Sequence, residues 1–86
     1  MRRAARTDSN HAEIVAAYRK RGYSVLDVSK LKNCCDLFVA RNGQTWAVEI
    51  KDGKKPPSKR KLTDGEQTFR DGWKGMYVII EKELDI

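Results

Sequence analysis

Three charged residues interrupt the stretch CDLFVARNGQTWAVEIKDG, whose apolar residues are otherwise typical of β-strands. Strand side chains alternate between the two faces of a sheet, so Glu49 and Lys51 lie on one face, about 7 Å apart along the strand. The dipeptide Asn42-Gly43 is a strong hairpin signal, and a hairpin closed there brings Asp36 almost opposite Glu49. Carboxylates that face each other on neighbouring strands repel unless a cation lies between them. The spacing therefore predicts a cation between Asp36 and Glu49, with Lys51 beside it.

The residue types suit a hard divalent cation. Mg²⁺ prefers oxygen ligands and keeps several waters, so two carboxylates and a backbone carbonyl are a suitable set. An adjacent lysine can orient a water or stabilise the charge that develops on a phosphate. Together these groups predict metal-assisted hydrolysis of a phosphodiester. The competing interpretation is a surface ion pair, but the flanking residues are apolar and a basic loop follows directly.

The elements predicted around these residues follow the order α-β-β-β-α-β. We expect strands over residues 23–28, 36–41, 44–51 and 76–81, and helices over residues 8–22 and 62–73. The last strand is an unbroken apolar run, which predicts burial on both faces. Thr63 and Glu66 form a T-x-x-E capping box for the second helix, and Gly22 suits the left-handed end of the first.

The length indicates one domain over residues 1–86. The net charge of +6 favours polyanions, with nucleic acid the first candidate and an anionic membrane surface the second. No apolar run approaches the roughly 20 residues that span a bilayer, and no apolar stretch follows the charged N-terminus as in a signal peptide. The adjacent Cys34 and Cys35 fit neither a disulfide framework nor a zinc spacing, so we expect a reducing, cytoplasmic environment.

The loop DGKKPPSKRK is strongly basic, and its two prolines favour an extended backbone. Each cation can neutralise a phosphate, which gives affinity and salt dependence but no sequence readout. Residues 1–8 form a second basic segment, with Arg2, Arg3 and Arg6, that we expect to be a flexible arm. The predicted nucleic-acid-binding residues are Lys54, Lys55, Lys59, Arg60 and Lys61.

From Glu13 to about Ile80 the sequence resembles the PD-(D/E)xK nuclease superfamily and, within it, the VRR-NUC group, which is similar to archaeal Holliday-junction resolvases. The segment VEIK, the loop PPSKRKLT and the pair EQ that follows carry the resemblance. It implies an α/β (α+β) fold with a restriction-endonuclease-like α-β-β-β-α-β core, in which helices flank a mixed central sheet. It also implies that Mg²⁺, for which Mn²⁺ can substitute, is the cofactor.

The resemblance also assigns the site residues. Asp36, Glu49 and the backbone carbonyl of Ile50 would bind the metal, and Lys51 would be the catalytic lysine. One departure from the family pattern is Cys35, which stands where the family has a proline. Two further catalytic residues are implied: Glu13, which joins the metal site from the first helix, in many members through water, and Gln67, a helical glutamine near the lysine.

The implied function is a structure-selective DNA endonuclease that acts as a homodimer on Holliday junctions or other branched DNA. A small core, and apolar residues around Trp73, Met76 and Tyr77 that we expect to be exposed, also favour burial against a second copy. Two alternatives remain. The order α-β-β-β-α is also that of a double-stranded RNA-binding domain, a non-catalytic module that the basic charge would suit. The chain can also be a small subunit of a larger complex, in which the acids are structural.

Overall fold

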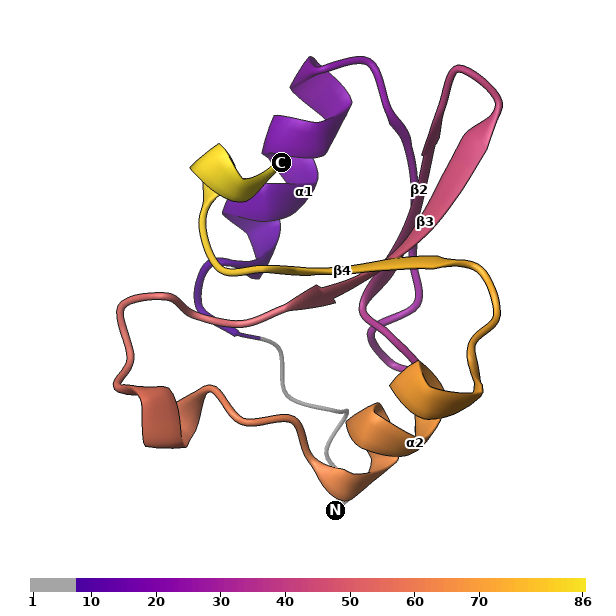
Figure 1. The fold of residues 1–86 in the computed structure, drawn as a ribbon. Helices are drawn as coiled ribbons and strands as arrows, with labels where there is room; N and C mark the ends of the chain where they lie inside the picture. The colour runs from indigo at the N-terminus through magenta and orange to yellow at the C-terminus, as the bar shows by residue number, and fades with distance from the viewer. Residues whose placement is uncertain (1–7) are drawn as a thin grey trace.

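The fold is built on a mixed four-stranded sheet (Figure 1), in which Glu49 lies within a strand and Asp36 and Lys51 lie next to strand ends. The strands are β1 (Ser24–Asp27), β2 (Leu37–Arg41), β3 (Gln44–Ile50) and β4 (Met76–Ile80), and the helices are α1 (His11–Lys20) and α2 (Asp64–Gly72). The sheet order is β1-β2-β3-β4, with β4 parallel to β3 and the other pairs antiparallel. The predicted α-β-β-β-α-β order and mixed sheet are therefore confirmed. The computed structural model describes residues 8–86, so the predicted arginine arm lies outside the described residues.

The β2–β3 hairpin sets the position of the first acid. Asn42 and Gly43 have φ values of 54° and 77°, and a type I′ turn requires positive φ at both positions. The register pairs Leu37 with Val48, and the Asp36 backbone N–H donates to the Val48 carbonyl at 3.0 Å. Asp36 therefore lies one residue beyond β2 and next to Glu49 in the register, as the hairpin predicted.

The two helices cover opposite faces of the sheet, with α1 and α2 on either side of β4 in Figure 1. α1 packs its buried stripe onto a core of aliphatic residues: Ile14, Val15 and Tyr18 lie against Leu37, Val39, Val48, Ile50 and Ile80. On the other face, Phe69 of α2 lies 6.4 Å from both Phe38 and Tyr77, measured between ring centroids. Because residues alternate along β3, the face that α2 covers is also the face of Glu49.

The start of each helix is joined to the part of the sheet that carries the acids. The predicted capping box of α2 is confirmed, since Thr63 and Glu66 exchange both of its hydrogen bonds. Gly65 lies against Asn33, so that a Cβ at position 65 would overlap the Asn33 Oδ1 atom. At the start of α1, the Asn10 side-chain amide donates to the carbonyls of Lys51 and Glu81, at 3.1 Å each. Asn10 thereby joins α1 to the ends of β3 and β4.

The prediction that the last strand is buried on both faces is wrong. Within residues 8–86, β4 pairs with β3 alone and forms one edge of the sheet. Ile80 is fully buried, but Ile79 is 39% exposed and the other three residues of β4 are half-buried. The apolar run has another explanation. On one face of the sheet, Val78 and Ile80 contact the aliphatic core, and on the other face Tyr77 packs against Phe69.

The apolar surface also differs from the expectation. Trp73, Met76 and Tyr77 are half-buried rather than exposed, because Trp73 and Tyr77 both pack against Phe69. The exposed large apolar side chains in the described part of the chain are instead Leu26, Leu31, Ile79 and Leu84. Over residues 8–86, no helix has the length and apolarity that a bilayer crossing requires.

Candidate active site

The structure brings Asp36, Glu49 and Lys51 together at one end of β3. Glu49 is 2% exposed and Lys51 is 7% exposed, so neither lies on a freely solvated face. The Asp36 carboxylate accepts a hydrogen bond from the Ile50 backbone N–H at 2.8 Å, which holds it beside the residue between Glu49 and Lys51. The Lys51 Nζ atom lies 4.0 Å from Glu49 Oε2. The three side chains thus lie close together, with Glu49 and Lys51 buried and Asp36 half-buried.

Lys51 is paired with Glu66, a residue that the sequence indicated only as a helix cap. Glu66 Oε1 accepts a hydrogen bond from Lys51 Nζ at 2.8 Å and another from the Thr63 backbone N–H at 2.8 Å. The signal for this contact was present, because a capping-box glutamate turns back toward the start of its helix. What the sequence did not reveal is that the start of α2 lies above the end of β3.

Asp8 is a further acid that sequence reasoning did not assign to the site. Its charge raises the pKa of Lys51. Burial raises the pKa of the Asp8 carboxyl itself against the opposing effects of Lys51 and Lys55. We refer to Asp8, Asp36, Glu49 and Glu66 as the acidic cluster. Glu66, Glu49 and Asp8 all act on the charge of Lys51, the buried lysine, so acidic groups outnumber the buried cation.

The directions of the pKa shifts show which acidic group is left without a positive partner. Burial raises the pKa of the Glu49 carboxyl well above its ordinary value, and the neighbouring Asp36 and Glu66 carboxylates raise it further. Burial alone would lower the pKa of Lys51, but the Glu66 ion pair and the Glu49 charge outweigh it and raise the pKa. Burial likewise raises the pKa of Glu66, but hydrogen bonds from Lys51 and Thr63 outweigh it and lower the pKa. Lys51 and Glu66 therefore satisfy each other, and Glu49 is left without a full counter-charge.

This imbalance fits a cation held between carboxylates. Asp36, Glu49 and the Ile50 carbonyl offer hard oxygen donors, which are the ligands that Mg²⁺ prefers. A groove of about 190 Å³ reaches Asp36 and Glu66 from solvent, between the loop at Asn33 and the start of α2. Among the described residues, no set of three or more His, Cys, Asp or Glu side chains forms a metal-binding group.

Two predicted site residues lie elsewhere in the structure. Gln67 is exposed, and its side-chain amide donates to the Leu62 carbonyl at 3.1 Å. It follows Glu66 directly, so it points about 100° further around α2 and away from Lys51. Glu13 is exposed and lines a separate cleft of about 450 Å³, which Asp52, Arg60 and other polar residues share. Neither side chain is brought to the Asp36–Glu49 pair.

The basic loop lies mostly on the surface. It begins extended at Pro56 and then forms the short 3₁₀ helix η1 (Pro57–Lys59). Arg60 differs from the other predicted nucleic-acid-binding residues, because it is half-buried and pairs with Glu81 at 2.9 Å. The exposed cations of the loop are Lys54, Lys55, Lys59 and Lys61.

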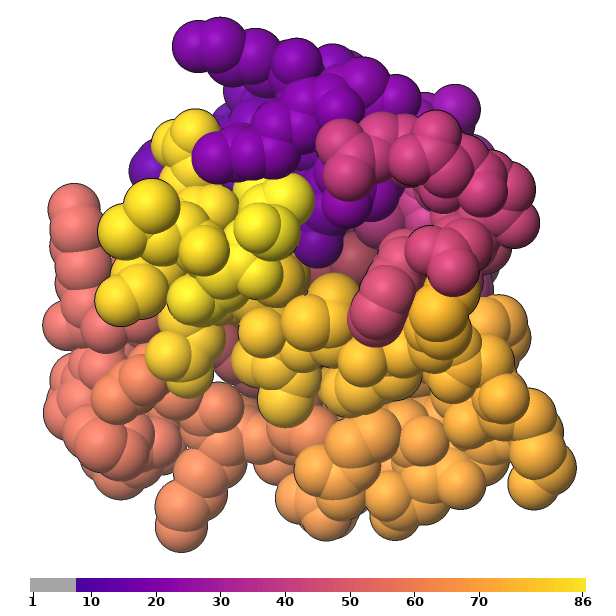
Figure 2. Space-filling view, turned by 45° about the horizontal axis from the view of Figure 1, so that its top comes forward, coloured from indigo at the N-terminus to yellow at the C-terminus, as the bar shows by residue number. Residues whose placement is uncertain are grey.

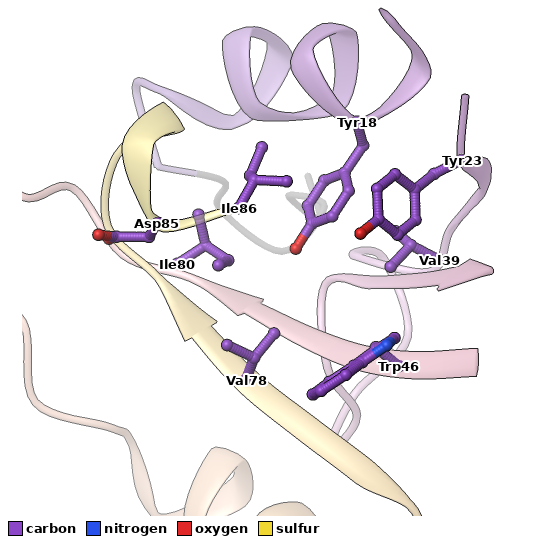
Figure 3. A pocket seen from close by; sticks show the side chains of 8 residues that line it. All are labelled: Tyr18, Tyr23, Val39, Trp46, Val78, Ile80, Asp85 and Ile86. Carbon is purple, nitrogen blue, oxygen red and sulfur yellow. The ribbon is translucent and has the colours of Figure 1, made fainter. Parts of the chain in front are cut away.

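A third cavity, of about 120 Å³, lies on the opposite face of the sheet (Figure 3). Figure 2 shows the surface hollowed where α1, the β2–β3 hairpin and the C-terminal segment meet. Aromatic and aliphatic side chains line most of the cavity, among them Tyr18, Tyr23 and Trp46, with Asp85 at one end. Its lining has none of the paired carboxylates that distinguish the face of Glu49.

Comparisons with known proteins found no match for this chain, whether among protein-family models, curated proteins or solved structures. A functional assignment therefore depends on the side chains themselves.

Proposed function

We propose that the chain is a Mg²⁺-dependent, structure-selective DNA endonuclease. One observation carries the proposal: the buried Glu49 carboxylate lies beside Asp36, while the nearest lysine is already paired with Glu66. Burial and like charge both oppose ionisation of Glu49, so without a metal this pair keeps a proton, which a divalent cation can replace. A restriction-endonuclease-like core, with the active site at the end of its hairpin, is the finer fold assignment that accompanies this proposal.

Each residue has a role that its position supports. Asp36, Glu49 and the Ile50 carbonyl would hold the Mg²⁺ ion. Mn²⁺ also prefers oxygen ligands and could replace it. When bound, such an ion polarises a phosphoryl oxygen and lowers the pKa of a coordinated water. The Lys51 ammonium is held next to Glu49, where it can stabilise negative charge that develops on the phosphate during cleavage.

The proposed substrate is branched DNA, bound by a homodimer. The exposed lysines of the basic loop begin three residues after Lys51, so phosphates bound by the loop lie near the acid pair. β4 has an uncovered outer edge with Ile79 exposed, and uncovered strand edges are templates for pairing with another chain. A two-fold dimer presents two sites and suits a four-way junction, in which two strands are nicked.

The experiment is cleavage of labelled linear, flap and four-way-junction DNAs with Mg²⁺, with Mn²⁺ and with EDTA. We expect paired nicks across the junction with either metal and none with EDTA. Lys51→Ala should abolish cleavage yet still bind DNA, while Lys74→Ala, at an exposed site after α2, is the matched control. Metal-independent cleavage, or binding of double-stranded RNA without any cleavage, would refute the proposal. Sedimentation of the same samples at micromolar concentration tests the dimer separately.

A further inference from the structure

Glu66 joins the start of α2 to the side chain of Lys51 through one carboxylate oxygen. Glu66 Oε1 accepts from Lys51 Nζ and from the Thr63 backbone N–H, both at 2.8 Å. The Glu66 backbone N–H donates in turn to Thr63 Oγ1 at 3.2 Å. The direction of the carboxylate is therefore set by the backbone at the first turn of α2, and the carboxylate sets the position of the Lys51 amine.

A lysine needs such a contact if its amine is to act at one point. The Lys51 side chain ends in a compact ammonium on a flexible four-carbon stem. Glu49 Oε2 lies 4.0 Å from the amine, which is too long for a hydrogen bond and leaves the amine's direction open. Displacement of a reacting group by about 1 Å can lower a rate about 10²-fold. Of the two acids, Glu66 makes the short, directional contact.

We propose that Glu66 is a positioning residue, whose carboxylate, held by the start of α2, keeps the Lys51 amine beside Glu49. The inference rests on the proposed function, because it concerns the lysine that acts in cleavage. It makes the Glu66 carboxylate part of the active site. It also gives a reason for the close approach at Gly65, which lets this turn lie against Asn33 in the loop before Asp36.

Three variants separate positioning from helix capping. Glu66→Ala removes the oxygen that holds Lys51, whereas Glu66→Gln keeps an oxygen that can accept from both donors. Thr63→Ala is the matched control, since it weakens the same capping box but leaves the Glu66 carboxylate and the Thr63 N–H in place. Loss of either cap residue should lower the Tm by about 4–8 °C.

Steady-state kinetics on a junction DNA with Mg²⁺ give the first readout. We expect Glu66→Ala to lower kcat about 10²-fold with little change in KM, and Glu66→Gln to stay within about 10-fold of the original chain. Thr63→Ala should keep nearly full turnover in spite of its lower Tm. Equal losses in Thr63→Ala and Glu66→Ala would show that the cap alone matters, and faster turnover in Glu66→Ala would show that Glu66 restrains the lysine; either result overturns the proposal.

A readout independent of cleavage is the ¹⁵N signal of the Lys51 ammonium. Slow proton exchange at Nζ is expected in the original chain, in Thr63→Ala and in Glu66→Gln, but not in Glu66→Ala. A slow signal that persists in Glu66→Ala would overturn the proposal. If the original chain cleaves no DNA with either metal, the proposed function fails, and this signal still decides whether Glu66 positions Lys51.

Discussion

The Asp36 carboxylate accepts a hydrogen bond from the Ile50 backbone N–H at 2.8 Å, across 14 positions of the chain. A side chain here takes the place that a backbone carbonyl would take in a longer β2. This contact aligns Asp36 with Glu49. It also gives the Ile50 N–H an acceptor, without which this buried donor would be unpaired. Asp36 therefore has a structural role as well as its proposed role in holding the metal, and substitution can separate the two.

Asp36→Asn and Asp36→Ala should differ in stability but not in activity. Asparagine keeps an oxygen that accepts from the Ile50 N–H, so the fold should be nearly as stable as before. Alanine leaves that N–H without its partner, which costs about 1–3 kcal/mol of unfolding free energy. Urea unfolding monitored by tryptophan fluorescence measures the difference, and both variants should fail to cleave DNA. Equal stability of the two variants would show that the hydrogen bond contributes little.

Mg²⁺ should stabilise the folded chain through Glu49. A ligand that binds only the folded state adds about 2.7 kcal/mol of unfolding free energy at 100 times its Kd. Titration of MgCl₂ against thermal unfolding should therefore raise the Tm of the original chain and leave that of Glu49→Gln unchanged. Glu83→Gln, which changes an acid far from the site, is the control and should respond like the original chain. An equal rise in all three would indicate a general salt effect.

Without metal, the chain should lose stability as the pH rises. The pKa of Glu49 is raised above its ordinary value of 4.5, so the folded chain holds this proton more tightly than the unfolded chain. The resulting stabilisation is complete below that ordinary value and is lost as the pH rises through the raised pKa. Unfolding in EDTA from about pH 5 to about pH 8 should show this decline, and Glu49→Gln should flatten it. Asp52 and Glu66 have lowered pKa values, so the stability that they contribute changes with pH only below this window.

The exposed loop lysines should govern DNA affinity rather than turnover. Changing Lys54, Lys59 and Lys61 together to alanine should flatten the slope of log affinity against log salt by about 2.7 if all three contact duplex phosphates. Turnover at saturating DNA should change little, because these side chains lie outside the acidic cluster. Lys20→Ala, at the end of α1, is the surface control. An unchanged slope would show that the loop faces away from the DNA.

The sequence predicted local features and missed those that depend on distant contacts. The Asn42-Gly43 turn fixed the hairpin register, and that register placed Asp36 beside Glu49, because a two-residue turn leaves little freedom. The contact between Glu66 and Lys51 depends on where α2 lies relative to the sheet. Neither the hairpin nor the capping box contains that information.

Two of the expectations that differ from the structure have related causes. β4 was expected to be buried on both faces, but an apolar run shows which side chains are covered and not whether a further strand pairs with it. Gln67 was expected near Lys51, but the residue that contacts Lys51 is its neighbour Glu66. Successive side chains on a helix differ in direction by about 100°. Both errors concern direction in space rather than the type of element.

The Glu66 carboxylate also closes a loop, because Lys51 and Thr63, which it joins, flank residues 52–62 on both sides. A segment whose two ends meet at a fixed base can be exchanged for another of different length at low entropic cost, since doubling the length of a loop costs only about 0.6 kcal/mol. Asp52, Gly53 and Arg60 bond to Ser9 and Glu81, so the part of this segment that can be exchanged is the exposed stretch of residues 54–59. Grafting other sequences between Gly53 and Arg60 would change the exposed lysines of the loop while the residues of the acidic cluster stay in place.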